Sequence, residues 1–414
     1  MKSSILLGAL LAGAGFAALP LPAAAQETVT LEEALALAGA TDGVSPGSQN
    51  PRTIGPRAEV EAAQALLTQA GLRPNPEASL EVENVAGSGP YSGLSAAEYT
   101  LSAGLPLELG GKRGARLAAA RADVDVALLR EKMAIADLAM TVRQRYVGAV
   151  AAQSRVALAL NVVERNRELA RIAAELVAAG REPPLRSLRA QAELSEAEAE
   201  LKAAQATALA SRFVLGMLWS QDPAPPPAEG FPRLEPPHEM LAEYQGLEPR
   251  LAAAERIAAQ SLVGRERASG IPDPRVSAGV RRFEESNDNA LVLGVTLPLP
   301  FRDRNQGHVA AARAQARGAA ARETVAVSEY RQAVAEARAD YLAAEAKADT
   351  LEAESLPQAE EALRLADIGY RNGKFELIEV LSAAEARDGI RRALIDAREA
   401  QGKAAALLIR LATQ

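Results

Sequence analysis

The sequence has no cysteine among its 414 residues and only two histidines, His238 and His308. The lack of cysteine excludes disulfide bonds, thiolate metal sites, cysteine nucleophiles and cysteine-linked lipid anchors. The two histidines stand far apart in the sequence, which leaves little for imidazole catalysis or metal ligation. A P-loop, a dinucleotide-binding fingerprint and an H-E-x-x-H motif are also missing. The sequence therefore predicts a protein that is not an enzyme, with no catalytic residue, no metal site and no cofactor.

Aromatic residues make up only 3% of the sequence, although 48% of it is hydrophobic. Small apolar side chains, mostly alanine, form thin and closely packed layers, and the mixture of alanine, glutamate, leucine and arginine is typical of long packed helices. The formal net charge is −7, which argues against nucleic acid as a partner.

Residues 1–25 have the three parts of a secretory signal peptide. Lys2 supplies the positive start, an apolar run follows from Ile5 to Leu21, and Ala23-Ala24-Ala25 form the small-residue cleavage pattern. After this segment there is no run of about 18 uncharged apolar residues, so no helical membrane span is expected. We therefore expect an exported protein that enters a membrane only through β-strands.

The chain repeats itself at an interval of about 192 residues. The matched segments are Pro74–Pro76 with Pro272–Pro274, Leu105–Leu107 with Leu297–Leu299, and Leu117–Ala122 with Val309–Ala314. So long a period indicates a duplicated supersecondary unit rather than a solenoid repeat. The predicted division is a first repeat with N-terminal helices at 26–220, a connector at 221–238 and a second repeat at 239–414.

Each repeat is predicted to hold a helix, a β-hairpin and a long helical hairpin. Apolar and polar residues alternate with a period of two at about 77–107 and 275–299, as strands with two different faces require. The helical hairpins are expected at about 112–219 and 305–412. The first long helix runs without proline for roughly 100 Å, so it must pack lengthwise against other long helices. In the second repeat, Pro357 predicts a kink or a restart.

Two shorter segments complete the predicted layout. A helix is expected from Arg57 to Ala70, ended by Gly71. Residues 221–238 are rich in proline, which favours an extended conformation. We expect them to form a connector in the equatorial region of the assembly rather than a core element.

Four amphipathic strands are too few to close a transmembrane barrel, which needs about eight. A homotrimer would supply 4 × 3 = 12 strands, and its helices would form 12 columns when the shorter ones are stacked. The predicted fold class is therefore mainly α with a small transmembrane β-barrel contribution. In it, a duplicated strand pair and long helical hairpin build a trimeric 12-strand β-barrel, continued by a 12-column α-helical barrel whose alanines let helices approach closely.

With these features the sequence resembles the outer membrane factor (TolC-like) family. The motifs that carry the resemblance are Pro74–Glu77 before the first strand, Leu107–Arg113 after the second strand, and Gly369–Phe375 at the second helical turn. The last two look most like the CzcC branch of heavy-metal efflux systems. The few aromatic residues depart from the interfacial girdle that is common in outer-membrane barrels.

The resemblance implies a channel-tunnel of the bacterial outer membrane with its helical barrel in the periplasm. It would be the passive conduit of a tripartite efflux pump for divalent heavy-metal cations. The implied partners are two further copies of the chain, a periplasmic adaptor (membrane fusion) protein, an inner-membrane proton-driven RND-type transporter and outer-membrane lipid. The alternatives are a TolC-like conduit for drugs or other small molecules, and a periplasmic helical-hairpin adaptor or scaffold.

The resemblance also implies functional residues near the two helical turns. The adaptor-docking candidates are Gly180, Arg181, Glu182, Gly373 and Lys374, although simple reversal of the helices also accounts for the glycines. Asp367 precedes the second turn, and three copies of it would form an acidic ring near the closed end of the tunnel that favours cations. The alternative for Asp367 is a surface carboxylate paired with Arg364 or Arg371.

Two further groups of residues belong to the strands. The alternation places Glu81, Glu83 and Arg281 on the polar strand faces, as a water-filled barrel interior requires. The strand-to-helix junctions are marked by Pro106, Gly110, Gly111 and Pro298. Both histidines are expected to be surface residues rather than ligands.

Overall fold

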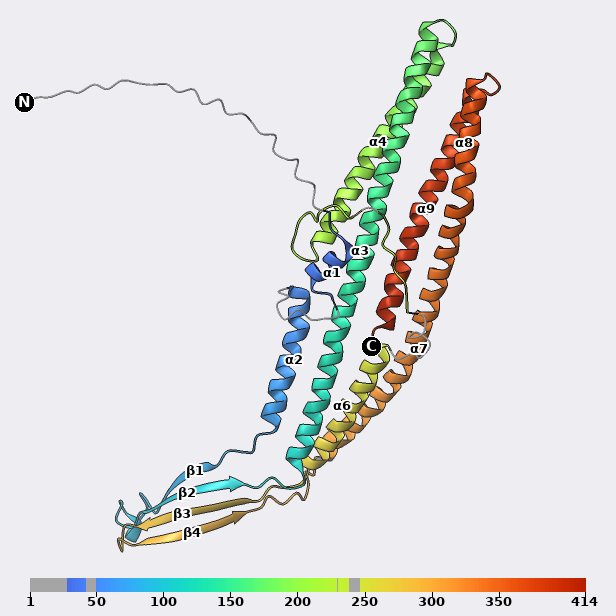
Figure 1. Ribbon diagram of the computed structural model, residues 1–414. Helices are drawn as coiled ribbons and strands as arrows, with labels where there is room; N and C mark the ends of the chain where they lie inside the picture. The colour runs from blue at the N-terminus through green and yellow to red at the C-terminus, as the bar shows by residue number, and fades with distance from the viewer. Residues whose placement is uncertain (1–27, 42–49, 229, 238–245) are drawn as a thin grey trace, which may run out of the picture.

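A computed structural model of the protein describes residues 28–41, 50–228, 230–237 and 246–414. The predicted signal peptide at 1–25 and His238 lie outside these residues. Figure 1 shows an elongated molecule in which two helical hairpins run side by side and a small sheet lies at the end opposite their turns. The duplication therefore produces two parallel copies of one unit, joined along their length.

The first repeat contains four helices and two strands among the described residues. These are α1 (Leu31–Ala38), α2 (Pro51–Ala70), β1 (Glu77–Glu83), β2 (Glu98–Pro106), α3 (Lys112–Ala178) and α4 (Pro184–Gly216). A single 3₁₀ turn at Gly89–Tyr91 lies in the loop between the two strands. At 67 residues, α3 is about 100 Å long, the length that its proline-free sequence predicts.

The second repeat has the same order of elements. These are α6 (Leu247–Ser269), β3 (Arg275–Phe283), β4 (Asn289–Thr296), α7 (Gln306–Thr350), α8 (Leu356–Arg371) and α9 (Leu377–Ala412). A π-helical turn at Leu351–Ser355 separates α7 from α8, and Pro357 is the second residue of α8. The predicted interruption at this proline is thus confirmed, because proline cannot donate the hydrogen bond that a regular α-helix needs there.

The prediction that the first short helix begins at Arg57 is wrong, because α2 begins at Pro51. Asn50 caps this helix by accepting a hydrogen bond from the backbone N–H of Arg52, and proline is favourable at the first helical position. Thr53 is buried at 2% exposure. The cap and this burial stabilise the first turn although Pro56 leaves one helical hydrogen bond unmade.

The helices stack into long columns. α3 packs against α2 and α4 on one side and against α6 and α9 on the other, while α7 packs against α6 and α9. In Figure 1, α2 continues the line of α4, and α6 continues the line of α9. The buried side chains along these columns are mostly alanine, and a Cβ atom on Gly402 of α9 would approach the Val147 side chain of α3 to 2.9 Å. Small residues therefore set the short distance between helices.

The four strands form one antiparallel sheet in the order β1-β2-β3-β4. The central pair, β2 and β3, comes from the two different repeats, so the sheet joins them. Leu101 faces Val280 in this pair, and Thr100 faces Arg281. β1 and β4 are the two outer strands of the sheet.

The proline-rich connector is extended, but the prediction that it is not a core element is wrong. Ala224 is fully buried and belongs to the apolar cluster formed by α1, α3 and the end of α4. Extended proline-rich chain makes no internal hydrogen bonds, and the Ala224 backbone instead exchanges hydrogen bonds with the backbone and side chain of Arg212. Its small side chain and these external partners allow the connector to enter the core.

A buried arginine ties three helices together in the middle of the molecule. Arg410 of α9 is only 4% exposed and pairs with Asp137 of α3 and Glu248 of α6. A buried guanidinium group is tolerated only when carboxylates neutralise it. Arg410 therefore fixes the position at which the two repeats cross.

Candidate functional site: the sheet, its junction with the helices and the helix tips

One face of the sheet is polar. Opposed residues of an antiparallel sheet share a face, and alternate residues of a strand do the same. The register therefore places four carboxylates and two guanidinium groups on this face. They are Glu77, Glu81, Glu83, Glu98, Arg275 and Arg281. Glu81, Glu83 and Arg281 of the predicted set are thus on one face, and Arg275 and Glu98 join them.

The two arginines cross the polar face diagonally. Arg281 of β3 donates to Thr100 Oγ1 and to Glu98 on β2, both at 2.8 Å, and its Nη2 lies 2.8 Å from Glu83 Oε2 on β1. Arg275 likewise passes over β2 and pairs with Glu77 on β1. Two ion-paired arginines therefore connect three strands. Among the described ion pairs on this face, neither arginine is paired with Glu81.

The other face of the sheet is apolar and open. Nine of its side chains are exposed hydrophobic residues, and those of β4 are the most exposed, at 72–75%. These residues are Leu80, Val82, Leu101, Leu105, Val276, Val280, Leu291, Leu293 and Val295. A soluble monomer rarely exposes a continuous apolar patch of this kind, which marks an interaction surface.

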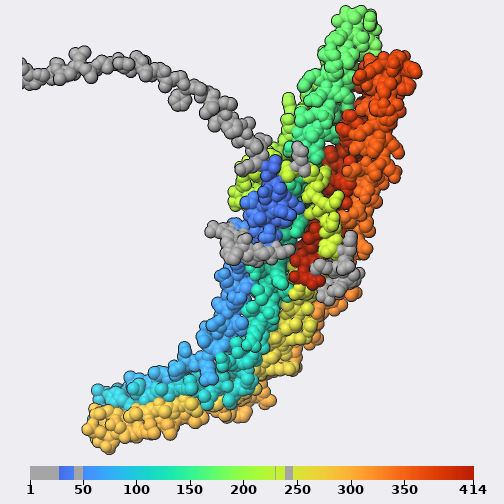
Figure 2. All heavy atoms as spheres, viewed as in Figure 1, coloured from blue at the N-terminus to red at the C-terminus, as the bar shows by residue number. Residues whose placement is uncertain are grey.

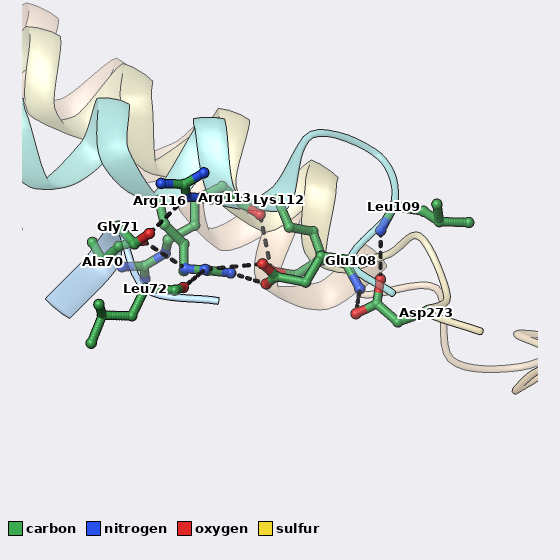
Figure 3. Close-up of polar contacts among 11 residues, drawn as sticks. Ala70, Gly71, Leu72, Glu108, Leu109, Lys112, Arg113, Arg116 and Asp273 are labelled. Atoms are coloured by element: carbon green, nitrogen blue, oxygen red, sulfur yellow. Dashed lines mark hydrogen bonds and ion pairs between the residues drawn. The ribbon is translucent and has the colours of Figure 1, made fainter. Parts of the chain in front are cut away.

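The junction between the sheet and the helices is held by charged side chains, which Figure 3 shows. Asp273, just before β3, accepts hydrogen bonds from the Leu109 backbone at 3.0 Å and from Lys112 Nζ at 2.6 Å. Arg116 of α3 pairs with Glu108 and also donates to the Leu72 carbonyl at 3.0 Å. These contacts fix the end of α2, the start of α3 and the approach to β3 relative to one another.

The pKa of Arg116 is raised, first by the hydrogen bond to Glu108, against an opposing effect of burial. The carboxylate stabilises the charged form of the guanidinium group. The guanidinium group of Arg116 therefore stays charged beside Glu108. The sequence patterns did not predict this pair. They mark Gly110 and Gly111 as the junction residues, whereas Glu108 and Arg116 lie on either side of them.

Two of the predicted junction residues have special backbone conformations. Gly110 and Gly111 both have positive φ angles, 68° and 70°. A Cβ atom on Gly110 would lie 2.3 Å from Ile271 Cδ1, so a side chain does not fit there. Pro106 ends β2 and faces Arg275, and Pro298 follows β4 by two residues. All four residues thus lie where strands give way to helices.

At the second junction the left-handed backbone before the helix is formed by an asparagine instead of glycine. Asn305 precedes α7 with a φ angle of 61°, and its side-chain amide donates to the Glu266 carbonyl of α6 at 2.7 Å and to the Glu266 carboxylate at 3.0 Å. This hydrogen bond is the first cause of the lowered pKa of Glu266. Asparagine tolerates a left-handed conformation because its side chain can hydrogen-bond locally.

The predicted adaptor-docking residues lie at the two tips of the helical hairpins. Gly180 and Gly373 both have positive φ angles, 70° and 66°, which end α3 and α8 in left-handed caps. Glu182, which precedes α4, pairs with Arg186 in the first turn of that helix. Figure 2 shows the two tips as neighbouring lobes at one end of the molecule.

Asp367 lies in α8 one turn before the second tip. It pairs with Arg371 at 2.9 Å, and both side chains are exposed, at 42% and 75%. Arg364, the other possible partner, pairs with Glu361 instead. The tip itself is closed by Phe375, whose ring lies against Gly369 so closely that a Cβ atom there would come within 2.1 Å of it.

The comparisons with known proteins identify the family. The family described as "Outer membrane efflux protein" matches residues 51–218 and 248–413. The protein belongs to the outer membrane efflux protein family. Its two matched segments coincide with the two repeats, which confirms the duplication. This assignment places the protein in the outer membrane with a periplasmic helical part, and it decides against a periplasmic adaptor or scaffold.

Relatives of this efflux protein include curated metal-resistance proteins. The cobalt-zinc-cadmium resistance protein CzcC of Cupriavidus metallidurans is 33% identical over 370 residues, which cover 87% of this chain and 84% of that one. The nickel and cobalt resistance protein CnrC of the same organism is 34% identical over 287 residues, covering 64% and 66%. The predicted resemblance to the CzcC branch is confirmed.

Solved structures show that the fold is that of outer-membrane channels. The protein VceC of Vibrio cholerae has a TM-score of 0.74 at 20% identity, over 92% of this chain and 96% of that one. CusC has a TM-score of 0.75 at 16% identity, over 92% of each chain. The neighbours share the helical barrel and β-barrel architecture, which confirms the predicted fold class.

The described residues give little evidence for a membrane-spanning helix or for a metal site. By length and composition, one described helix, α3, is long and apolar enough to span a membrane, and 44% of its most apolar window is buried inside the protein; a single such helix is weak evidence for a membrane span. Within the described ranges, no group of three or more histidine, aspartate or glutamate residues is placed to hold a metal ion.

The family is one of transport conduits. Gly43–Gly47 matches the G-x-S-x-G pattern of serine hydrolases, which is one enzyme motif that the sequence does contain. These residues lie outside the described ones. Pro46 follows the serine, and proline lacks the backbone N–H that the oxyanion hole of such enzymes takes from this position. The pentapeptide therefore does not support hydrolase activity.

Proposed function

We propose that three copies of the protein form a passive tunnel in the outer membrane that exports divalent heavy-metal cations. The observation that carries this proposal is the two-faced sheet, apolar and exposed on one side and rich in carboxylates on the other. Four strands cannot close into a barrel that spans a membrane, whereas three copies provide twelve. The apolar face would contact lipid and the polar face would line the water-filled interior.

The charge of the polar face supports cations as the cargo. Four carboxylates stand against two guanidinium groups, so each chain contributes a net charge of −2 (−4 + 2) to the interior. A narrow interior lined by one sign of charge concentrates ions of the opposite sign. The metal-resistance names of the relatives also favour metal cations over drugs as the cargo.

The helix tips would dock a periplasmic adaptor, which in turn connects the tunnel to a proton-driven RND-type transporter of the inner membrane. The two tips lie next to each other at the end of the molecule farthest from the sheet, where a periplasmic partner can reach them. Photocrosslinkers at Arg181 and Lys374 are expected to capture an adaptor. Crosslinkers at the β1–β2 loop serve as the control, and capture only from that end contradicts docking at the tips.

Asp367 would contribute three carboxylates to a ring at the periplasmic entrance. Arg371 offsets part of this negative charge, but an exposed ion pair is weak, so the carboxylate can exchange Arg371 for a passing cation. Asp367→Ala is expected to lower cation selectivity and block by divalent ions, and Arg371→Ala is expected to raise both. Unchanged selectivity in both variants removes Asp367 from the pore.

The proposed function as a whole is tested in planar lipid bilayers. Purified protein is expected to form channels whose reversal potential in a salt gradient indicates cation selectivity. Glu81→Gln combined with Glu83→Gln is expected to reduce that selectivity, while Glu81→Asp combined with Glu83→Asp keeps both charges and is the matched control. A protein that forms no channels, or channels selective for anions, contradicts the proposal.

A further inference from the structure

The outer strands β1 and β4 each have one edge without a partner strand in the described sheet. An unpaired edge beside an exposed apolar face is a template for pairing with another chain. We propose that β4 of one protomer pairs with β1 of the next in a register set by the internal duplication, such that the numbers of opposed residues add up to 375. This inference rests on the proposed trimer and specifies which residues meet at its seam.

The duplication relates the strands by two fixed offsets. Pro74-Asn75-Pro76 and Pro272-Asp273-Pro274 relate β1 to β3 by 198 residues, while Leu105–Leu107 and Leu297–Leu299 relate β2 to β4 by 192. The registers of the two hairpins check the sum of these offsets. The observed pair Glu77↔Gly104 becomes Arg275↔Thr296, which is also an observed pair. The sequence offsets therefore reproduce the register of the second hairpin from that of the first.

The seam between protomers is the counterpart of the pairing between β2 and β3. Within one chain, that pairing joins the second strand of the first repeat to the first strand of the second repeat. Around a trimer, the next such joint runs from β4 to the partner's β1. Applying the offsets to Leu101↔Val280 gives Leu293 opposite the partner's Val82, and Gly104↔Ser277 gives Thr296 opposite the partner's Ser79.

The two faces of the strands agree with this register. Leu293 and Val82 both belong to the exposed apolar face, as do Val295 and the residue opposed to it, Leu80. Thr296 and Ser79 both belong to the polar face. A slip by one residue would place apolar side chains of one strand beside polar side chains of the other along the whole seam, which burial of one face forbids.

The seam differs chemically from the joint within the chain. The offsets place Ala290 and Val292 where Glu98 and Thr100 stand in β2, and Glu83 where Arg281 stands in β3. The cluster of charged residues that holds β2 to β3 is therefore missing between protomers. The seam is held by backbone hydrogen bonds and by apolar pairs, and it leaves Glu81 opposite the partner's Gly294, where no side chain competes for the carboxylate.

Disulfide crosslinking tests the register, and the absence of native cysteine makes every crosslink specific. The double variant Val82→Cys, Leu293→Cys is expected to form covalent dimers and trimers under mild oxidation, since directly opposed residues bring their Cβ atoms to about 5 Å. Ser79→Cys with Thr296→Cys tests the polar face in the same way. Within one chain, β1 and β4 are three strand spacings apart, about 14 Å, too far for a disulfide.

The controls shift the register by two residues and keep the face. Val82→Cys with Val295→Cys, and Leu80→Cys with Leu293→Cys, place the cysteines at diagonal positions about 7–8 Å apart, so these variants are expected to remain monomeric on denaturing gels. Stronger crosslinking of the shifted pairs, or no crosslinking of the in-register pairs in a protein that is trimeric by light scattering in detergent, overturns the register and leaves the proposed tunnel standing. A monomeric unmodified protein overturns both.

Discussion

Arg275 on β3 reaches across β2 to pair with Glu77 on β1, and it passes over Gly104 on the way. Its Nη2 donates to Glu77 Oε1 at 3.0 Å, and a Cβ atom on Gly104 would lie 3.5 Å from Arg275 Cδ. The glycine thus leaves an open path across the polar face. This path allows two strands that are not neighbours to share an ion pair.

The pairing predicts that the size of the side chain at position 104 controls the Glu77–Arg275 interaction. Both partners are about half exposed, so a double-mutant cycle with Glu77→Ala and Arg275→Ala should give a coupling energy of about 0.2–1 kcal/mol. In a Gly104→Leu background the coupling should fall to zero, because the leucine occupies the path. Gly104→Ala is the matched control, since its Cβ makes only ordinary contact, and equal coupling in all three backgrounds contradicts the role of the glycine.

The glycine pair before α3 allows a second test with a built-in control. Gly111 has a positive φ angle and free space around its Cα, so Gly111→Ala should cost only the backbone strain of about 1–2 kcal/mol. Gly110→Ala should cost more by roughly another 1–3 kcal/mol, because its methyl group would overlap Ile271.

Urea unfolding of both variants in detergent measures this difference. Ile271→Ala is expected to remove the excess cost of Gly110→Ala when the two are combined, relative to Ile271→Ala alone. Equal destabilisation by Gly110→Ala and Gly111→Ala would show that Ile271 yields without cost.

Arg410 is predicted to stabilise the crossing of the two repeats. Arg410→Ala should destabilise the protein by about 3 kcal/mol, the lower end of the range for a broken buried ion pair, because Asp137 is half exposed and can be rehydrated. Arg398→Ala is the matched control. Arg398 also bridges two carboxylates but is more exposed, so its loss should cost less than about 1 kcal/mol. Thermal unfolding measures the loss of stability in both variants. Similar losses of stability in Arg410→Ala and Arg398→Ala contradict the prediction.

The strands and helices could be predicted from the sequence because each depends on local patterns. The alternation around Leu80 and Leu293 gives the strands, and the proline-free run after Lys112 gives α3. Contacts between the strands were not predictable in the same way. Glu77 and Arg275 are 198 residues apart, and alternation assigns them to polar faces without saying which strands are neighbours or which glycine lies between them.

The remaining errors have physical reasons as well. The apolar spacing suggested a helix start at Arg57, but the cap at Asn50 lies outside the hydrophobic pattern that the prediction used. The proline content of the connector predicted an extended segment outside the core. It did not indicate that Ala224 is buried, because its backbone partner, Arg212, belongs to α4 and lies outside the connector. Among the candidate site residues, the tip glycines were recognisable because positive φ favours glycine, whereas Asp273 and Glu108 act through partners from another repeat or another turn.

Glu266 predicts a specific acid sensitivity. Its pKa is lowered, first by the hydrogen bond from Asn305, so the ionised carboxylate is favoured in the folded protein. The resulting stabilisation is complete above the unfolded pKa of about 4.3 and is lost as the pH falls through the lower folded value. Asn305→Gly keeps the left-handed backbone but removes the amide, so it should weaken the fall in stability below about pH 4.3. Unfolding midpoints from pH 3 to 7 measure this, and an unchanged acid profile contradicts it.

The second helix tip supplies the last prediction. The Phe375 ring lies against Gly369 in α8, and the Gly369 carbonyl accepts hydrogen bonds from the backbone of Lys374 and of Phe375. Phe375 is half exposed, so a methyl group at position 369 would push its ring outward into solvent rather than strain the core. Gly369→Ala should therefore change the shape of the tip while costing little stability.

If the tip docks an adaptor, Gly369→Ala should reduce crosslinking from Lys374 and lower metal resistance in cells, while channel conductance in bilayers stays normal. Gly389→Ala in α9 is the control, because a Cβ atom there meets nothing within 4 Å and alanine favours the helix by about 0.5–1 kcal/mol. Phe375→Ala separates shape from contact. If it restores docking to Gly369→Ala, the displaced ring is the obstacle, and if it abolishes docking alone, the ring itself is part of the contact. Normal crosslinking and resistance in Gly369→Ala would show that the adaptor does not read the shape of this tip.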